Sequence, residues 1–330
     1  MCEENIHAIT ITAIVNCKLS YLSGMQVHRS IENLPRFRNA VITIGTFDGV
    51  HEGHQKIIDA LINEARSIQG EAVIITFHPH PRKIVNPNEH LQLINTLNEK
   101  IELLGKTSID HLVIIPFNQS FANQSADEYI EDFLIEKFHP HTIIIGYDHH
   151  FGKDRKGNFM LLAQKADQYS YCLLEIPKYL LDEVGVSSTK IRNALLQSDV
   201  ETANKLLGYN FFFEGIVIKG DQLGRTLGYP TANLQYADPD KIHLGHGVYA
   251  AYAEVNGKKY KGMLSVGNRP TLENSNERVE INIFDFDSEI YGEAVRVTVK
   301  KYLRGQEKYA SLDELKKQLA IDKENSLAIL

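Results

Sequence analysis

The first half of the chain alternates short apolar runs with amphipathic stretches. The apolar runs are five to seven residues long and cover residues 40–45, 71–77, 111–117, 142–146 and 171–176. Apolar residues at helical spacing lie between them, at Ile57, Ile58, Leu61, Ile62 and Ala65 and again at Leu97, Ile101 and Leu104. Strands that are apolar on both faces are typical of parallel sheets covered by helices. The pattern predicts an α/β, doubly wound parallel sheet, with ligands at the carboxyl ends of its strands.

The pattern changes near residues 205–210. Residues 187–207 are helical in pattern, and Gly208 is a suitable stop. From residue 211 the strands are short, alternating and separated by turns, and Asn256-Gly257 is a hairpin signal. We predict a small antiparallel β-barrel, closed by a C-terminal helix over 311–320 with Ser311 and Glu314 as its capping box. Ser125 and Glu128 have the same spacing before the helical stretch 125–138.

Three segments follow from these boundaries: 1–24, 25–205 and 206–330. Residues 1–24 do not continue into an obvious element, and Met25 opens the first domain-like pattern. We interpret 1–24 as an N-terminal extension or tail that lies outside the domain. The alternative is a real edge strand.

Composition narrows the class of protein. With 43% apolar and 23% charged residues, the chain has the balance of a soluble globular protein. The net charge of −7 argues against a general nucleic-acid binder, which would need a basic surface. Cys2, Cys17 and Cys172 form no C-x-x-C pair, and no apolar run approaches the roughly 20 residues of a membrane span. We expect a cytoplasmic protein, with no membrane association and no obligate protein partner.

The stretch "GTFDGVHEGH", residues 45–54, follows the first apolar run. A strand, a glycine-containing loop and a helix starting near Gly53 would form a phosphate site, because helix N-termini expose unpaired N–H groups. Glycines at 45, 49 and 53 let an anion approach the backbone. His51 and His54 are three residues apart and can face one side, where imidazoles could stabilise phosphate charge. Metal ligation and incidental surface histidines are the alternatives.

The stretch "VSSTKIR", residues 186–192, is the second element. Ser187, Ser188 and Thr189 stand at the start of a helical pattern, and Arg192 follows one turn later. Small hydroxyl residues at this place can be simple caps. Arg192 adds a bidentate phosphate donor, so the two stretches together suggest a triphosphate held from both sides.

These two motifs resemble the H-x-G-H and S-S-T-x-x-R signatures of the nucleotidyltransferase superfamily. "TFHPHP" (76–81) and "GYDHHFGKDRKGN" (146–158) resemble segments of the bacterial bifunctional riboflavin kinase/FAD synthetase family. The resemblance implies a Rossmann-like FMN adenylyltransferase domain, with His51 and His54 stabilising the transferred group. It implies ATP contacts from Gly45, Phe47, Asp48, Gly49, His51, Gly53, His54, Ser188, Thr189 and Arg192, and FMN contacts from His80, Asp148 and Phe151. Relatives commonly have Phe and Arg where this chain has His149 and His150.

The densest stretch of the second half is "GIVIKGDQLGRTLGYPTANL", residues 215–234. Its glycines, together with Arg225, could form a flap over phosphates, although turns between strands have the same composition. Thr231 and Asn233 lie two residues apart in an extended segment and offer hard oxygen ligands for Mg²⁺. Glu280 stands in a strand otherwise rich in β-branched and aromatic residues and is a candidate general base, with an exposed strand Glu as the alternative.

This half resembles the riboflavin kinase module of the same family, so the resemblance covers about residues 25–330. It implies Glu280 as the base for the ribityl 5′-hydroxyl and Mg²⁺ at Thr231 and Asn233. The implied ATP and flavin contacts are Gly220, Gly224, Arg225, Gly228, Pro230, Thr231 and Asn233. Asn282 stands where many relatives have His.

The implied reactions run in series. Riboflavin and ATP give FMN and ADP in the C-terminal domain, and FMN and ATP give FAD and diphosphate in the N-terminal domain. Mg²⁺ would serve both, and the partners would be riboflavin, FMN, FAD and ATP. Three alternatives stay open: a kinase with a degenerate adenylyltransferase module, a non-catalytic flavin-binding regulator, and a nucleotidyltransferase for another phosphate ester.

Overall fold

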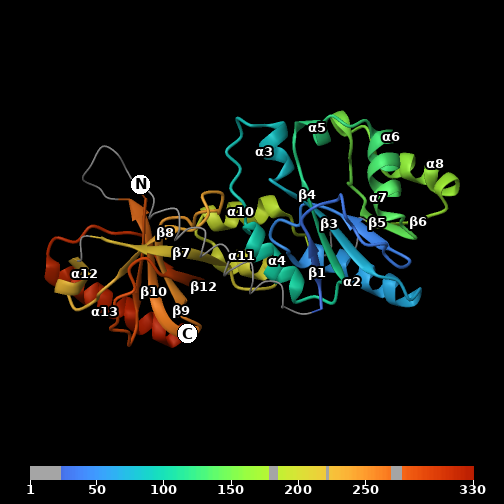
Figure 1. Cartoon of the computed structure of the whole chain (residues 1–330). Coiled ribbons are helices and arrows are strands. Elements are labelled where there is room, and N and C mark those ends of the chain that lie inside the picture. Colours follow the sequence, from blue (N-terminus) through green and yellow to red (C-terminus); the bar gives the residue numbers. More distant parts are fainter. Residues whose placement is uncertain (1–23, 178–184, 221–222, 269–276) are drawn as a thin grey trace, which may run out of the picture. The chain divides into compact units, whose positions relative to one another are not determined.

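The computed structural model describes residues 24–177, 185–220, 223–268 and 277–330 (Figure 1). The predicted extension over residues 1–24 therefore lies outside the described residues, apart from Gly24. The chain packs as two compact units. The first runs up to Leu91 and continues over Leu97–Val186, and the second comprises Gln92–Thr96 and Ser187–Leu330.

A parallel sheet forms the centre of the first unit. Its strand order is β1-β4-β3-β2-β5-β6. The strands are β1 (Gln26–His28), β2 (Val41–Ile44), β3 (Ala72–His78), β4 (His111–Pro116), β5 (Thr142–Gly146) and β6 (Cys172–Ile176). All five strands expected from the apolar runs are present, and every neighbouring pair is parallel. The edge strand β1 was not predicted, because three residues are too few to show a period.

Helices cover both faces of this sheet, as the apolar strands predicted. On one face, Ile58 and Leu61 of α2 pack with Ile101 of α4 against the strands. On the other face, Phe133 and Leu162 belong to the opposite apolar cluster. The helical segments are α2 (Glu52–Ser67), α3 (Pro81–Val85), α4 (Leu97–Gly105), α5 (Gln119–Ala122), α6 (Ala126–Glu128), the π-helix η1 (Tyr129–Ile135), α7 (Glu136–Phe138), the 3₁₀ turn η2 (Lys153–Arg155) and α8 (Phe159–Tyr169).

The predicted helix over residues 125–138 has its capping box. The Ser125 hydroxyl accepts from the Glu128 N–H, and the Glu128 carboxylate accepts from the Ser125 N–H. Its centre is wound as the π-helix η1 instead of as an α-helix. The wider turn buries Tyr129, Ile130, Phe133 and Leu134 together in the core.

A closed antiparallel barrel forms the second unit, with strand order β10-β11-β8-β7-β12-β9 (Figure 1). Its strands are β7 (Phe212–Ile218), β8 (Ala232–Tyr236), β9 (Gly247–Val255), β10 (Lys258–Asn268), β11 (Glu277–Ile283) and β12 (Ala294–Arg304). The predicted hairpin joins β9 to β10, with left-handed φ angles of 49° at Asn256 and 77° at Gly257. The helices are α10 (Ser188–Leu196), α11 (Val200–Leu207), α12 (Leu223–Thr226) and α13 (Leu312–Ile329).

The stretch predicted as one helix over 187–207 is two helices. Ser198 adopts a left-handed φ of 65°, which ends the first helix. Asp199 then caps the second by accepting the Thr202 N–H at 3.1 Å. Gly208, with a φ of 79°, ends α11 as predicted.

Residues Gln92–Thr96 pack in the second unit although the chain on both sides belongs to the first. Leu93 pairs in parallel with Lys241, and the buried Lys241 ammonium donates to the Ile94 carbonyl at 2.7 Å. The division by packing between Val186 and Ser187 thus differs from the boundary at 205–206. That boundary was placed where the strand pattern changes, and it stays a prediction about the two functional domains.

Candidate active sites

Three loops leave adjacent strands at the carboxyl edge of the parallel sheet. The loop 45–51 follows β2, His80 follows β3, and Asp148 follows β5. From β2 the chain adds β3 and then β4 on one side of the sheet. It then crosses back, and β5 pairs with β2 on the other side. This reversal is a topological switch point, where open α/β sheets bind ligands. The predicted location of the site at this edge agrees with the fold.

The loop 45–51 contains three residues with left-handed backbone. Their φ angles are 47° at Phe47, 95° at Gly49 and 36° at Val50. Gly49 adopts such an angle without strain, but the bulky Phe47 and the β-branched Val50 do not. The other two glycines are closely packed. A Cβ at Gly53 would lie 2.9 Å from the Val186 side chain, and one at Gly45 would lie 3.1 Å from the Phe47 ring.

His51 and His54 lie together at the N-terminus of α2. Their rings stack with centroids 3.6 Å apart and an interplanar angle of 10°. His51 caps the helix, since its Nδ1 accepts the His54 N–H at 3.2 Å. Burial, and then the proximity of His51 and Lys100, hold the pKa of His54 well below its usual range. His54 is therefore neutral at pH 7, and its buried Nδ1 has no hydrogen-bond partner within the described part of the chain.

The alternative of a metal site finds no support here. Among residues 24–177, 185–220, 223–268 and 277–330, no group of three or more His, Cys, Asp or Glu side chains could hold a metal ion. His51 is also buried, with 6% of its surface exposed, so it is not an incidental surface histidine.

The three residues expected on the flavin side have different environments. His80 caps α3 through its Nδ1, which accepts the Arg82 N–H at 3.2 Å. Asp148 is exposed, whereas Phe151 lies in the core and stacks on Tyr129 at 4.8 Å. The Nε2 of His149 is buried without a partner in the described residues, and burial lowers the pKa of His149 to about 4. The flavin contacts stay a prediction.

The second motif lies on α10 of the second unit. Ser187 is the N-cap, and its hydroxyl accepts the Lys190 N–H at 3.2 Å. Capping thus accounts for Ser187, while Ser188 and Thr189 occupy the first turn. Arg192 donates from Nε to the Gln92 carbonyl at 3.0 Å. The predicted ATP contacts of Ser188, Thr189 and Arg192 are not tested by these interactions.

A cavity of about 720 Å³ in the barrel unit brings together the predicted kinase residues. Thr231, Asn233 and Glu280 all line it. Glu280 on β11 lies directly opposite Asn233 on β8, and its carboxylate accepts from the Thr231 hydroxyl at 3.4 Å. Glu280 is thus half-buried in a cavity and is not an exposed strand Glu.

Two neighbours hold this wall of the cavity. Arg278 contacts the Glu280 carboxylate at 3.4 Å, and Asn282 donates to the Pro230 carbonyl at 2.5 Å. Gly220 leaves room for Asn233, because a Cβ at Gly220 would lie 2.1 Å from its amide nitrogen. Gly220 therefore packs closely against this metal-ligand candidate, and a larger residue would displace the Asn233 side chain.

The predicted flap is only partly described. Residues 221–222 lie outside the described residues, and Leu223–Thr226 form a single helical turn, α12. Gly224 lines the large cavity, whereas Arg225 lines a second one of about 420 Å³ and lies 3.7 Å from Glu289. Gly228 has a left-handed φ of 81°.

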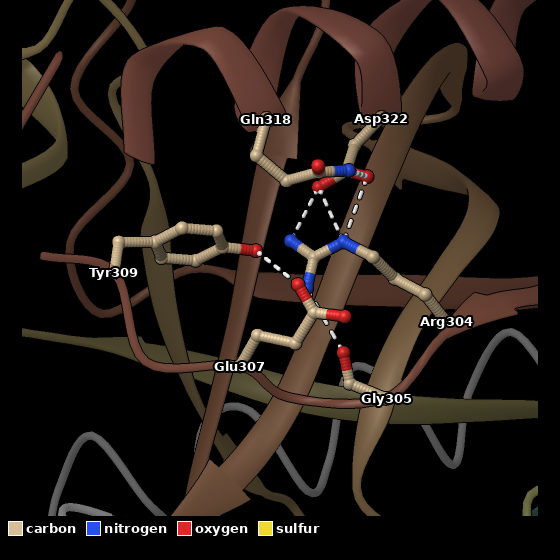
Figure 2. Close-up of polar contacts among 6 residues, drawn as sticks. All are labelled: Arg304, Gly305, Glu307, Tyr309, Gln318 and Asp322. Carbon is tan, nitrogen blue, oxygen red and sulfur yellow. Dashed lines mark hydrogen bonds and ion pairs between the residues drawn. The ribbon is translucent and has the colours of Figure 1, made fainter. Parts of the chain in front are cut away.

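Helix α13 and the end of β12 also line this cavity, and Figure 2 shows their polar contacts. Arg304 forms a bidentate ion pair with Asp322, with distances of 2.9 Å from Nε and 2.6 Å from the second guanidinium nitrogen. Gln318 donates to the same carboxylate at 2.9 Å. Burial lowers the pKa of Arg304, but the hydrogen bonds and charge of Asp322 outweigh it and the pKa is raised.

Sequence reasoning missed Arg304, Asp322 and Lys100. Arg304 and Asp322 lie on separate elements, 18 residues apart in the sequence, so no local pattern indicates that they form a pair. Lys100 had a usable signal. It lies three residues after Leu97 and four before Leu104, which places a charge on the apolar face of α4.

Comparison with known families agrees with this division of chemistry. A family model described as FAD synthetase matches residues 34–190, and one described as riboflavin kinase matches residues 207–330. The fold and the two candidate sites therefore define a nucleotidyltransferase-type module followed by a kinase-type barrel.

Curated relatives carry both modules in one chain. A bifunctional riboflavin kinase/FMN adenylyltransferase from Buchnera aphidicola is 36% identical, covering 90% of this chain and 96% of its own. The proteins of that name from Escherichia coli K12 and Bacillus subtilis are 32% and 36% identical, covering 90% and 87% of this chain and 96% and 92% of their own. The chain belongs to the bifunctional riboflavin kinase/FMN adenylyltransferase family.

A solved structure has the same architecture. A crystal structure described as a macrolide-efflux protein from Streptococcus pneumoniae is 31% identical, with a TM-score of 0.80. The match covers 92% of this chain and 98% of that one. In the part of this chain that the structure describes, no helix is both long enough and apolar enough to span a bilayer.

Proposed function

We propose that this chain makes FMN and FAD in two successive steps. The barrel unit phosphorylates riboflavin with ATP, and the parallel-sheet unit transfers the adenylyl group of a second ATP to FMN. One observation carries the proposal: Thr231, Asn233 and Glu280 all line the same cavity of the barrel unit. These three side chains supply a candidate base and candidate metal ligands for phosphoryl transfer.

In the kinase step, the riboflavin 5′-hydroxyl attacks the γ-phosphorus of ATP and ADP leaves. Glu280 accepts the hydroxyl proton as the new oxygen–phosphorus bond forms. The Thr231 hydroxyl and the Arg278 guanidinium contact the two carboxylate oxygens at 3.4 Å each, which orients the base. Phosphoryl transfer depends on this kind of positioning.

The residues present also fit a magnesium ion. Thr231 supplies a hydroxyl and Asn233 an amide oxygen, and both are hard ligands suited to Mg²⁺ beside phosphates. Both side chains line the same cavity as Glu280. When bound there, Mg²⁺ would neutralise the negative charge of the nucleotide phosphates.

In the adenylyltransferase step, a phosphate oxygen of FMN attacks the α-phosphorus of ATP and diphosphate leaves. The stacked His51 and His54 at the N-terminus of α2 donate to the phosphate oxygens as charge develops there. We assign the remaining contacts as the motifs imply. Ser188, Thr189 and Arg192 bind the β- and γ-phosphates, while His80, Asp148 and Phe151 contact FMN. We further propose that the enzyme is cytoplasmic. This is in keeping with its three cysteines, which form no C-x-x-C pair.

The product profile of the purified protein tests the proposal. With riboflavin, ATP and Mg²⁺, chromatography should show FMN first and FAD later. Glu280→Gln should stop FMN formation but leave FAD formation from supplied FMN intact. His54→Ala should lower FAD formation by about 100-fold or more while FMN still accumulates.

Matched controls come from exposed positions in each unit. Glu254→Gln on β9 and His90→Ala before α4 should leave both activities unchanged, since both side chains are exposed. Loss of both activities in Glu280→Gln would rule out two separate sites. FMN formation without any FAD in the wild-type chain would favour a degenerate adenylyltransferase module, and flavin binding without ATP turnover would favour a regulator.

A further inference from the structure

A buried lysine lies beneath the loop that carries the two histidines. Lys100 on α4 has only 7% of its surface exposed. Its ammonium donates to the backbone carbonyl of Thr46 at 2.6 Å. Thr46 is the second residue of the "GTFDGVHEGH" stretch, so Lys100 contacts the loop directly, from 54 residues away in the sequence.

The loop needs such an anchor because its backbone is strained. Phe47 and Val50 adopt left-handed φ angles of 47° and 36°, which bulky and β-branched side chains disfavour. Strained residues persist only where the surrounding structure holds them in place. Several hydrogen bonds do so here. The Thr46 carbonyl accepts from Lys100 and, at 3.2 Å, from the Thr76 hydroxyl, while the Val50 carbonyl accepts from Gln55 at 3.4 Å.

Charged and titratable groups surround Lys100 on several elements. Asp48, which is buried, acts from the loop, and His54 lies on α2 with His51 stacked on it. Glu99 is the buried neighbour on α4 itself. Burial lowers the pKa of Lys100 to about 8, although the Asp48 carboxylate partly opposes the shift. Lys100 is therefore mostly charged at pH 7 and loses its charge within the range accessible to kinetic measurement.

We propose that Lys100 is a positioning residue for adenylyl transfer, because its hydrogen bond to Thr46 holds the strained turn that presents His51 and His54. The inference rests on the proposed FMN adenylyltransferase activity. Lys100 does not contact the reacting atoms in this account, and it acts only through the backbone of the loop. Placing it on α4 makes the geometry of the histidines depend on a second helix as well as on α2.

The role implies a pH dependence that the kinase reaction should not share. As the pH rises through about 8, Lys100 deprotonates and its hydrogen bond to Thr46 weakens. The turnover of FMN to FAD should therefore fall along an alkaline limb near pH 8. Arginine stays charged throughout this range, so Lys100→Arg should move the limb to higher pH by at least about one unit.

The experiment compares Lys100→Met, Lys100→Arg and the control Lys106→Met. Lys106 lies just beyond α4 and its side chain is 64% exposed. Steady-state rates of FAD formation from FMN, and of FMN formation from riboflavin, are measured on each preparation between pH 6 and 9.5. Lys100→Met should lower kcat for FAD formation by about 10- to 100-fold, with a smaller change in KM, because misplacing a catalytic group costs turnover. FMN formation and Lys106→Met should match the wild type.

Thermal unfolding separates positioning from folding. Lys100→Met removes a desolvation penalty but also a charged neighbour of the buried Asp48, so all rates are compared at a temperature at which the Tm shows every variant to be folded. A kcat within about threefold of the wild type, or an alkaline limb that stays at the same pH in Lys100→Arg, would overturn the proposal. If Lys100→Met fails to fold, the Lys100→Arg profile alone decides. If His54→Ala retains FAD formation, the proposed function has failed instead, whatever the lysine variants do.

Discussion

At the scale of single residues, the ion pair between Arg304 and Asp322 illustrates how burial changes what a charge contributes to the stability of the fold. Asp322 has 1% and Arg304 has 18% of its side chain exposed, and the pair joins β12 to α13 at the wall of the large cavity (Figure 2). A buried pair contributes little net stability against an apolar pair of the same shape, but either partner alone is strongly unfavourable. Asp322 should therefore be needed chiefly because Arg304 is there.

We expect Asp322→Asn to lower the stability of the barrel unit by about 3 kcal/mol, because it leaves the Arg304 charge without a matching partner. Scanning calorimetry of the purified chain measures the stability of the barrel unit. Its unfolding transition is the one whose temperature rises when riboflavin and ATP are added. The exposed pair between Lys301 and Glu201, 3.1 Å apart, serves as the control. Glu201→Gln should change the stability by less than about 0.5 kcal/mol. Equal effects of the two substitutions would contradict the argument.

At the scale of elements, the segment that follows β7 shows how a close backbone contact shapes a ligand site on the neighbouring strand β8. Gly220 follows β7 and lies against the Asn233 amide of β8, with no room for a Cβ between them. The glycine-rich pattern of residues 215–234 predicts a place for Gly220 in a phosphate flap. The structure adds a second reason for the glycine, which is the position of the Asn233 side chain.

We predict that Gly220→Ala displaces Asn233 and lowers kcat/KM for riboflavin phosphorylation by about tenfold or more. FAD formation from supplied FMN should stay unchanged, because that reaction uses the first unit. A double-mutant cycle identifies the cause. If Gly220 acts through Asn233, adding Gly220→Ala to Asn233→Ala should have little further effect on the kinase rate. Additive losses would show that Gly220 acts by another route.

Elements were predicted more reliably than their internal geometry. The strands from β2 to β6, the helix α2 and the β9–β10 hairpin follow from periodicity and turn residues, which are local properties. The π-wound centre of the segment 125–138 does not, because it is set by packing against the sheet. The break between α10 and α11 was also missed. Its signals, Ser198 and Asp199, are single polar residues inside an otherwise helical pattern.

At the scale of the whole molecule, two compact units carry two different candidate sites. Apart from Arg192, which lies two residues beyond the first match, each set of motif residues lies within a region that matches its own family model, 34–190 or 207–330. One helix packs differently from its motif set. Helix α10, which carries Ser188, Thr189 and Arg192, belongs to the barrel unit. The two activities should nevertheless be separable by substitution, because Glu280 and His54 lie in different units.

A mixture of two inactive chains tests this separation. Neither Glu280→Gln nor His54→Ala should convert riboflavin to FAD alone. Mixed in equal amounts, they should form FAD after a lag, because FMN released by one chain becomes the substrate of the other. Chromatography over time measures FMN and FAD, and doubling the Glu280→Gln chain, which converts FMN to FAD, should shorten the lag. FMN that accumulates without any FAD would show that released FMN cannot reach the second site.

The sequence by itself determined the two fold classes, most strand positions and the two sets of motif residues. It could do so because periodicity, caps and glycine-containing loops are encoded by neighbours along the chain. Only the tertiary structure revealed that Lys100 lies beneath the histidine loop, that Asp322 pairs with Arg304, and that Glu280 faces Asn233. These contacts join separate elements, and they exist because strand pairing and the packing of helices place distant segments side by side. The histidines of "GTFDGVHEGH" were visible in the sequence, but the strained turn that presents them was not.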